Sequence, residues 1–149
     1  MKTTNNQPAI REAKLQDAML LKDCIDRAYA PIREKLSDLP DVSAGVEEDI
    51  AKKTVLVAEY DGEIAGCAIF SIQEKKAHLV NIAVDPSFKG KGIGKALIAA
   101  MEATSKERGA TEIRLATHVD LPENVSLYQH LGWHETLRTE NKILMLKTL

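Results

Sequence analysis

Residues 85–95 read DPSFKGKGIGK and join two apolar segments of different periodicity. Before them, residues 76–84 are mostly apolar, which is typical of a strand inside a sheet. After them, residues 92–108 carry apolar side chains at helical spacing, and Gly109 is a typical helix terminator. The pattern therefore predicts a strand, a glycine-rich turn and a helix, in that order.

The predicted turn combines three features that favour a bound anion. Its three alternating glycines can adopt positive φ and let a ligand approach the backbone closely. The helix after it offers free N–H groups and the positive end of its dipole. Three lysines add positive charge: Lys89, Lys91 and Lys95. We therefore expect a pyrophosphate site, and the alternative is a solvated turn whose lysines serve solubility.

Two common nucleotide-binding fingerprints are absent from this turn. The P-loop pattern fails because Lys89 stands at its first glycine and Ala96, which follows Gly94-Lys95, has no hydroxyl for magnesium. The Rossmann pattern G-x-G-x-x-G fails because Lys95 or Leu97 occupies the last glycine position, depending on the start. A nucleotide site of either kind is thus not predicted.

The rest of the chain predicts an α+β domain of mixed, mostly antiparallel pairing. Asp61-Gly62 between two apolar runs indicates a β-hairpin, which residues 76–84 extend to a meander. Strands are predicted at residues 9–13, 54–60, 63–72, 76–84, 112–117, 133–138 and 142–146. Helices are predicted at residues 15–30, 32–36, 44–52, 92–108 and 122–131.

Several boundaries rest on single residues. Pro31 should interrupt the first helix, Ser43 should cap the short third one, and Gly132 should end the last. Residues 38–42 should form a loop and residues 1–8 a polar tail. No composition shift divides the chain, so we expect one domain spanning residues 1–149.

Composition limits the classes of function. The net charge is -2, which argues against a nucleic-acid partner, because such proteins usually carry a basic excess. No apolar run reaches the ~20 residues of a membrane span, and the polar N-terminus lacks a signal peptide pattern. We therefore expect a cytoplasmic protein. Cys24 and Cys67 lack metal-site spacing and are expected to be small buried residues, and no metal site is predicted.

The glycine-rich stretch resembles the acetyl-CoA signature of the GNAT superfamily of N-acetyltransferases, [QR]-x-x-G-x-[GA]. In that family the signature follows a strand that ends in hydrophobic-Ala-Val and then Asp-Pro, as Ile82-Ala83-Val84-Asp85-Pro86 does here. Lys89 departs from the pattern, which has glutamine or arginine at that position. The expected element order also resembles the family's, a sheet of about seven strands flanked by about four helices.

The resemblance implies acetyl-CoA as cosubstrate and assigns its contacts. The backbone of the strand end would bind the pantetheine arm, and the N–H of Val84 would polarise the thioester carbonyl. The turn and helix start would bind the pyrophosphate. The implied coenzyme contacts are Ile82, Ala83, Val84, Lys89, Gly90, Lys91, Gly92, Ile93, Gly94 and Lys95.

Residues 124–133, NVSLYQHLGW, resemble the family's second signature, in which a tyrosine acts as general acid toward the coenzyme sulfur. The resemblance assigns that role to Tyr128, whose phenol would keep its proton at neutral pH until the thiolate leaves. Asn124 lies one helical turn before it and is assigned to the coenzyme site. The alternative for Tyr128 is a half-buried packing residue.

His78 is the candidate general base. It lies six residues before Val84, where some family members have a catalytic glutamate, and imidazole titrates near neutral pH. The alternative is an edge histidine on the solvated face of the sheet. His118, His130 and His134 form no defensible metal cluster and are expected to be polar surface residues.

The residues thus favour an acetyl-CoA-dependent N-acetyltransferase that acts by direct transfer to a primary amine. A catalytically inactive acyl-CoA-binding regulatory domain is the alternative. The acceptor, a small molecule or a protein, is open, and so is the choice between a monomer and a homodimer.

Overall fold

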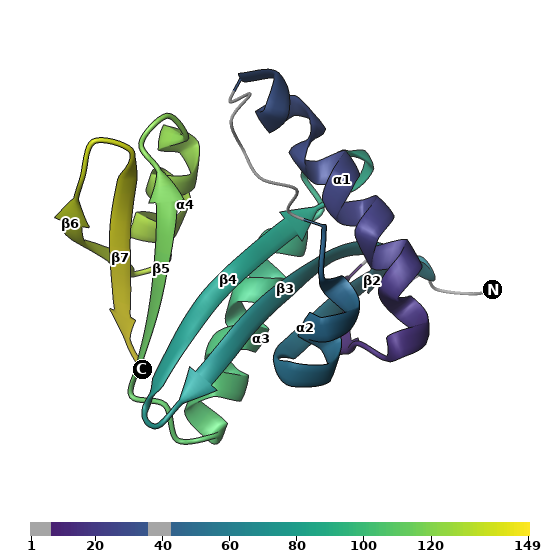
Figure 1. Cartoon of the computed structure of the whole chain (residues 1–149), viewed down its shortest axis with the longest axis horizontal. Coiled ribbons are helices and arrows are strands. Elements are labelled where there is room, and N and C mark those ends of the chain that lie inside the picture. The colour runs from purple at the N-terminus through teal and green to yellow at the C-terminus, as the bar shows by residue number, and fades with distance from the viewer. Residues whose placement is uncertain (1–6, 36–42) are drawn as a thin grey trace. The chain divides into compact units, whose positions relative to one another are not determined.

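The computed structural model describes residues 7–35 and 43–149 of the chain. Its strands form one seven-stranded sheet in the order β1-β2-β3-β4-β5-β7-β6 (Figure 1). The strands are β1 (Ala9–Glu12), β2 (Thr54–Tyr60), β3 (Glu63–Gln73), β4 (Lys76–Val84), β5 (Glu112–His118), β6 (His134–Arg138) and β7 (Lys142–Thr148). The α-helices are α1 (Ala18–Lys35), α2 (Val46–Lys52), α3 (Ile93–Glu107) and α4 (Pro122–His130).

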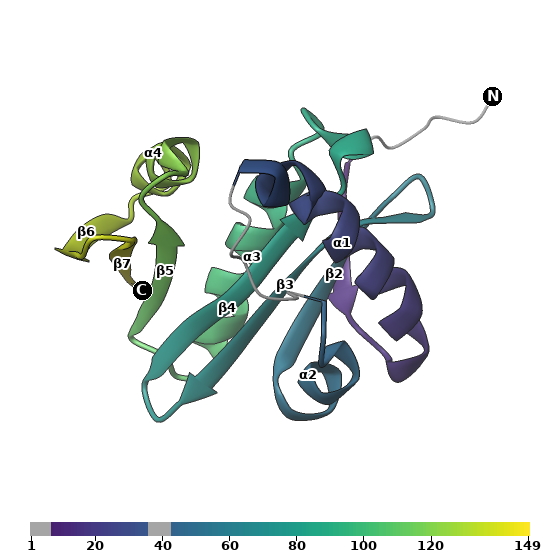
Figure 2. The same cartoon turned by 45° about the horizontal axis from the view of Figure 1, so that its top comes forward.

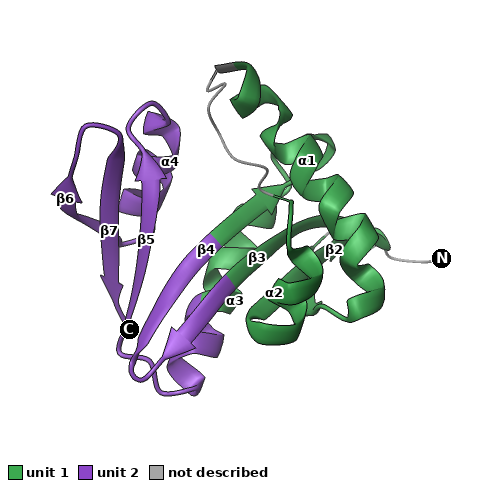
Figure 3. Ribbon diagram, viewed as in Figure 1, with its two compact units in different colours: residues 1–69, 81–101 green, residues 70–80, 102–149 purple. Residues whose placement is uncertain are grey.

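This order confirms the predicted α+β class. Two short 3-10 helices, η1 (Leu15–Asp17) and η2 (Pro86–Phe88), precede α1 and α3. The chain divides into two compact units (Figure 3). The first comprises residues up to 69 together with 81–101, and the second comprises residues 70–80 and 102–149. Among the described residues, no helix has the length and apolar character needed to cross a membrane.

The first unit has its core between helices and sheet. Helices α1 and α2 lie on one face of the strands of this unit, and α3 lies on the opposite face (Figure 2). The apolar stripe of α1 buries Leu21 and Ile25, because residues four apart share a helix face. They join one cluster of buried side chains with Val46, Val55, Val57, Cys67, Ile69, Ala83 and Ala18.

Gly66 of β3 lets α3 approach the sheet closely. A Cβ at this position would lie 2.6 Å from the carbonyl oxygen of Ala83 and 2.9 Å from a methyl group of Ile93. Real Cβ atoms do not approach other atoms so closely, so no larger residue fits without displacement of strand or helix. The glycine therefore fixes the start of α3 against the end of β4.

The predicted hairpin is confirmed. Asp61 and Gly62 have φ angles of 52° and 81°. Positive φ at both central residues is the hallmark of the type I′ turn that Asp-Gly favours. The short connection after β3 likewise allows only antiparallel pairing with β4, so β2, β3 and β4 form the expected meander.

The second unit contains the parallel pair of the sheet. β4 pairs with β5 in parallel at three positions, Lys76 with Glu112, Ala77 with Ile113 and His78 with Arg114. β5 pairs along its whole length with β7 in antiparallel orientation. β6 closes the edge, with a register irregularity between Glu135 and Leu137.

A single lysine ties three elements of the second unit together. The Nζ of Lys147 on β7 lies 2.8 Å from a carboxylate oxygen of Glu102 on α3. It also donates a 2.7 Å hydrogen bond to the carbonyl oxygen of Leu131, directly after α4. The carbonyl at the end of α4 thus gains a partner that the helix itself cannot supply.

Two predictions about the helices are wrong. α1 continues through Pro31 to Lys35 as one helix, because the proline removes only one backbone hydrogen bond and four residues follow it. α2 begins at Val46, and its N-cap is Gly45 with φ 81°, not Ser43. Within the predicted turn of residues 85–95, residues 86–88 form the short 3-10 helix η2. The loop predicted at residues 38–42 lies outside the described residues.

Candidate active site

The glycine-rich turn lies in the first unit, between the end of β4 and α3. Gly90 and Gly92 have φ angles of 82° and 76°, which L-residues with a side chain rarely adopt. A Cβ at either position would meet no atom within 4 Å. The two glycines therefore serve the backbone conformation, and the space beside them is open.

The start of α3 presents free backbone N–H groups. The first intrahelical bond runs from the N–H of Ala96 to the carbonyl of Gly92, at 3.0 Å. Helix geometry leaves the N–H groups before it, Gly92 to Lys95, without an intrahelical acceptor. Together with the helix dipole and the exposed side chains of Lys89, Lys91 and Lys95, these groups form an anion-binding arrangement.

Asp85 stabilises the start of the turn through hydrogen bonds of its side chain and its backbone. Its carboxylate accepts a 3.0 Å hydrogen bond from the N–H of Ser87 and a 2.8 Å bond from Nε of Arg27 on α1. Its own N–H donates to the carbonyl of Ala65. Burial raises the pKa of Asp85, but the bonds from Ser87 and Arg27 outweigh burial and hold the pKa below its usual value. Asp85 is therefore a structural carboxylate.

Aromatic contacts hold the middle of the turn. The rings of Phe88 and Tyr60 meet edge to face, with centroids 5.9 Å apart. The ammonium of Lys91 lies over the Tyr60 ring, 5.8 Å from its centroid. The end of β2 therefore supports the turn and orients one of its cations.

The strand end that precedes the turn is anchored to α1. Ala83 is buried, whereas Ile82 and Val84 are half-buried. Just before them, Asn81 accepts a 2.6 Å hydrogen bond from the hydroxyl of Tyr29 on α1. Burial raises the pKa of Tyr29 to about 12, so the hydroxyl keeps its proton and acts as a donor at neutral pH.

In the second unit, α4 carries the two residues of the second signature. Asn124 is half-buried and Tyr128 is buried, with 5% of its surface exposed. The Tyr128 ring lies beside that of Trp133, with centroids 5.6 Å apart, and its carbonyl accepts the Trp133 N–H. The Tyr128 ring therefore packs in the interior and is more deeply buried than the half-buried alternative described, and a role of its hydroxyl in catalysis stays a prediction.

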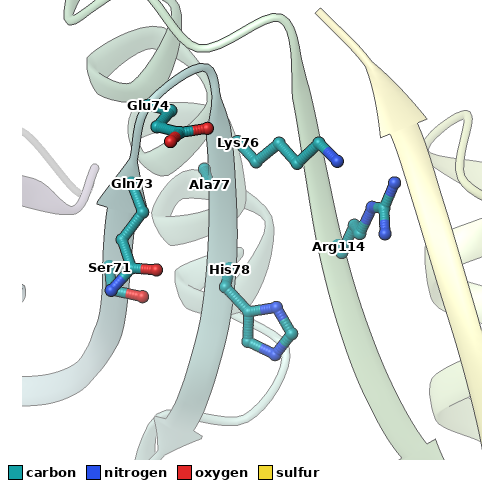
Figure 4. Close-up of a pocket in the computed structure, with 7 residues that line it drawn as sticks. All are labelled: Ser71, Gln73, Glu74, Lys76, Ala77, His78 and Arg114. Carbon is teal, nitrogen blue, oxygen red and sulfur yellow. The ribbon is translucent and has the colours of Figure 1, made fainter.

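His78 lies on β4 in the second unit and lines a pocket of about 540 Å³ (Figure 4). Its side chain is exposed on the face of the sheet, but β4 lies between β3 and β5, so His78 is not the edge residue that the alternative named. The pocket also gives it polar neighbours from three strands. The lining residues are Ser71, Gln73, Glu74, Lys76, Ala77, His78 and Arg114.

The other three histidines of the chain are His118, His130 and His134. Nδ1 of His118 accepts a 3.0 Å hydrogen bond from the N–H of Asp120 and shapes the loop before α4. His130 and His134 are exposed. Nothing in these environments points to a role in catalysis.

Comparison with known proteins identifies the arrangement. The family model described as the acetyltransferase (GNAT) family matches residues 21–133, about three quarters of the chain. The chain belongs to this family. Family membership accounts for the strand, glycine-rich turn and helix of the first unit.

Curated relatives match part of the chain. The [ribosomal protein bS18]-alanine N-acetyltransferase of Escherichia coli is 31% identical over 81 residues, which are 54% of this chain and 55% of the relative. The N-alpha-acetyltransferase of Sulfurisphaera tokodaii is 35% identical over 92 residues, 53% of this chain and 55% of the relative. The chain therefore spans about half the length of these relatives.

Solved structures match the fold over nearly the whole chain. PaiA N-acetyltransferase from Thermoplasma acidophilum, solved in complex with coenzyme A, has a TM-score of 0.82 at 23% identity, covering 96% of this chain and 99% of that one. The Escherichia coli ribosomal-protein-S18-alanine N-acetyltransferase has a TM-score of 0.76 at 21% identity, covering 95% and 94%. These matches show that the fold is the GNAT fold.

Sequence reasoning missed the residues that support the site. The Tyr29–Asn81 and Arg27–Asp85 bonds join positions more than fifty residues apart, and no local pattern indicates them. The sequence also offered no reason to place Arg114 beside His78. Strand alternation places it on the exposed face of β5, but its neighbour His78 becomes apparent only from the register of β4 and β5.

Proposed function

We propose that this protein is an acetyl-CoA-dependent N-acetyltransferase that acts on a primary amine by direct transfer. The observation that carries the proposal is the turn of residues 89–95. Its open backbone, free helix N–H groups and lysines suit a pyrophosphate, and family membership makes coenzyme A the natural carrier of that group.

The coenzyme would lie along the strand end and the turn. Backbone groups of Ile82, Ala83 and Val84 would bind the pantetheine arm, and the N–H of Val84 would stabilise the oxyanion of the tetrahedral intermediate. The turn and the start of α3 would bind the pyrophosphate. Asn124 is proposed as a further coenzyme contact.

The chemistry requires two proton transfers. The amine nitrogen forms a bond to the acetyl carbon, and the C–S bond breaks with its electron pair going to sulfur. We assign His78 to take the proton that the amine loses and Tyr128 to give a proton to the departing thiolate. The products are the acetylated amine and coenzyme A with a free thiol.

The cysteines favour direct transfer over an acetyl-enzyme intermediate. A covalent route needs a reactive nucleophile, and the thiolate is the reactive form of cysteine. Burial raises the pKa of Cys24 to about 11 and also raises that of Cys67. Both side chains are buried, so neither is suited to accept the acetyl group.

Ligand-dependent thermal stability tests the coenzyme assignment. A ligand that binds only the folded state at 100 times its Kd stabilises it by about 2.7 kcal/mol. We expect acetyl-CoA and coenzyme A to raise Tm by several degrees, and NAD at equal concentration to leave it unchanged. Equal stabilisation by NAD would contradict the coenzyme A assignment.

Turnover tests the enzymatic part separately. Coenzyme release, followed with a thiol reagent across a panel of amines, should exceed the rate without amine for at least one acceptor. Coenzyme binding without release for any amine would instead support the non-catalytic regulatory alternative.

A further inference from the structure

We propose that Tyr60 is a positioning residue for the pyrophosphate of the coenzyme, because its ring holds both ends of the β-turn that residues 88–91 form. The inference rests on the proposed function, since it takes this turn as part of the pyrophosphate site. Tyr60 is the last residue of β2 and is buried. It would therefore act on the coenzyme through the turn.

Residues 88–91 form a type II β-turn. The N–H of Lys91 donates a 3.2 Å hydrogen bond to the carbonyl of Phe88, three residues earlier. Between them, Lys89 has φ -60° and ψ 139°, and Gly90 has φ 82°. These angles are close to those of a type II turn, whose third residue requires positive φ. Lys91 thus closes a defined turn directly before the free N–H groups of the helix start.

The Tyr60 ring contacts the first and the last residue of this turn. The Phe88 ring meets it edge to face, with centroids 5.9 Å apart and an angle of 64° between the ring planes. The Lys91 ammonium lies over the ring, 5.8 Å from its centroid. Because one side chain makes both contacts, it opposes any opening of the turn that separates Phe88 from Lys91.

The exposure of the turn makes this support important. Lys89, Gly90 and Lys91 are exposed. Exposed segments with few buried apolar contacts open locally at low free-energy cost. A site that has to become ordered when the ligand binds loses affinity by that ordering. A turn that Tyr60 already holds in its binding conformation avoids this loss.

Lys91 can contact the ring and a phosphate oxygen at the same time. An ammonium group has three N–H donors, and the face of a ring occupies only one side of it. A lysine side chain also loses conformational freedom when a phosphate fixes it, and the contact with Tyr60 restricts the side chain in advance. The ring therefore prepares this cation for the pyrophosphate.

Tyr60 variants of the full chain test the inference, with Kd obtained from the dependence of Tm on ligand concentration. Tyr60→Leu keeps an apolar side chain but removes the ring, and it should raise the Kd of coenzyme A about threefold to tenfold, as expected for a lost cation–π contact. Tyr60→Phe keeps the ring and should restore the Kd of the unmodified protein. An unchanged Kd in Tyr60→Leu would overturn the inference.

Pantetheine, which lacks the pyrophosphate, distinguishes positioning from general destabilisation. Its Kd should be the same in Tyr60→Leu and in the unmodified protein. Val55→Ala is the stability control, because Val55 is buried on the same strand, and strand alternation places it on the opposite face from Tyr60. This control should lower Tm and leave both Kd values unchanged. Equal weakening of pantetheine and coenzyme A in Tyr60→Leu would overturn the inference.

A double-variant cycle tests whether Tyr60 acts through Lys91. Lys91→Met alone should raise the Kd of coenzyme A, whereas Lys52→Met, which changes an exposed lysine of α2, should not. Tyr60→Leu combined with Lys91→Met should raise Kd by less than the product of the two single increases, because each single variant removes the same contact. An increase equal to that product would overturn the inference.

Proton NMR supplies a readout that needs no change at Tyr60. Protons above an aromatic ring are shielded, so the ε-methylene protons of Lys91 should resonate upfield of those of exposed lysines. This shift should persist when inorganic pyrophosphate or coenzyme A is bound. Its loss on binding would mean that the cation leaves the ring, and the inference would then be wrong.

Inorganic pyrophosphate separates failure of the inference from failure of the proposed function. Pyrophosphate binding that Tyr60→Leu weakens, in a protein that does not bind coenzyme A, would contradict the proposed function and leave Tyr60 as a positioning residue. Coenzyme A binding that is equally tight in Tyr60→Leu and in the unmodified protein would overturn the inference and leave the proposed function standing.

Discussion

At the scale of single residues, Tyr128 combines packing with its proposed chemistry. Its ring lies against Trp133 and little of its surface is exposed, so the Tyr128→Phe variant should fold normally. Loss of the hydroxyl should lower kcat by about 10²–10⁴-fold, the usual contribution of a general acid. The KM for acetyl-CoA should change little. Steady-state kinetics measure both constants.

His130→Gln on the same helix is a suitable control, because His130 is exposed. Its kcat should equal that of the unmodified protein. A Tyr128→Phe enzyme with unchanged kcat would mean that another group, or water, protonates the thiolate.

His78 permits a second residue-scale test. His78→Ala removes the proposed base and should lower kcat by about 10²-fold or more. Because the side chain is exposed in an open pocket, added imidazole should reach the vacated position and restore part of the rate. The measurement is the rate of coenzyme release as a function of imidazole concentration.

Lys106→Gln, an exposed position on α3, controls for nonspecific effects of imidazole. No change in kcat for His78→Ala would leave His78 as a solvated residue on the face of the sheet.

At the scale of elements, Asp85 connects α1, the end of β4 and η2. Its pKa is lower in the folded state, so it contributes stability above its unfolded pKa of about 3.9, and this contribution disappears as pH falls through the folded value. Asp85→Asn should therefore lower the unfolding free energy at pH 7 by about 1–3 kcal/mol. The deficit should shrink as pH falls below about 4.

Urea unfolding at a series of pH values measures this difference. Asp26→Asn is the control, since Asp26 is an exposed residue of α1 close to Arg27 in sequence. A deficit that stays constant from pH 7 to pH 3 would show that Asp85 contributes through packing and not through its charge.

Two features of the secondary structure were predicted correctly from the sequence. The hairpin at Asp61-Gly62 and the end of α3 before Gly109 were predicted because one local residue pair or glycine determines the backbone there. The first helix was wrongly predicted to end at Pro31. The prediction considered the backbone hydrogen bond that proline removes but not the tertiary contacts that hold the helix on both sides of it. Tyr29 and Arg27, just before Pro31, bond Asn81 and Asp85.

At the scale of the whole molecule, a sequence signature can indicate a site built from one contiguous segment but not a pocket built from several strands. A pyrophosphate site needs one contiguous turn and the helix after it, so residues 89–95 could be proposed as such a site from the sequence alone. The pocket at His78 draws its side chains from three strands. Its composition depends on the register of β4 with β5, which no local pattern predicts.

Comparison with known proteins shows a contrast between the fold, which is widely shared, and the sequence, which is not. The fold matches solved structures over about 95% of the chain at identities near 20%, whereas curated relatives match about half of it at 31–35%. A shared fold thus accompanies wide divergence of side chains. The identity of the acceptor therefore has to be argued from the side chains of this chain and not from the fold.

The contact between Tyr128 and Trp133 provides a built-in optical probe. Trp133 is the single tryptophan of the chain and is buried, with its ring centroid 5.6 Å from that of Tyr128. Fluorescence excited at the red edge of indole absorption therefore comes from one position beside the proposed general acid. Changes in its emission would report on events at α4 without any attached label.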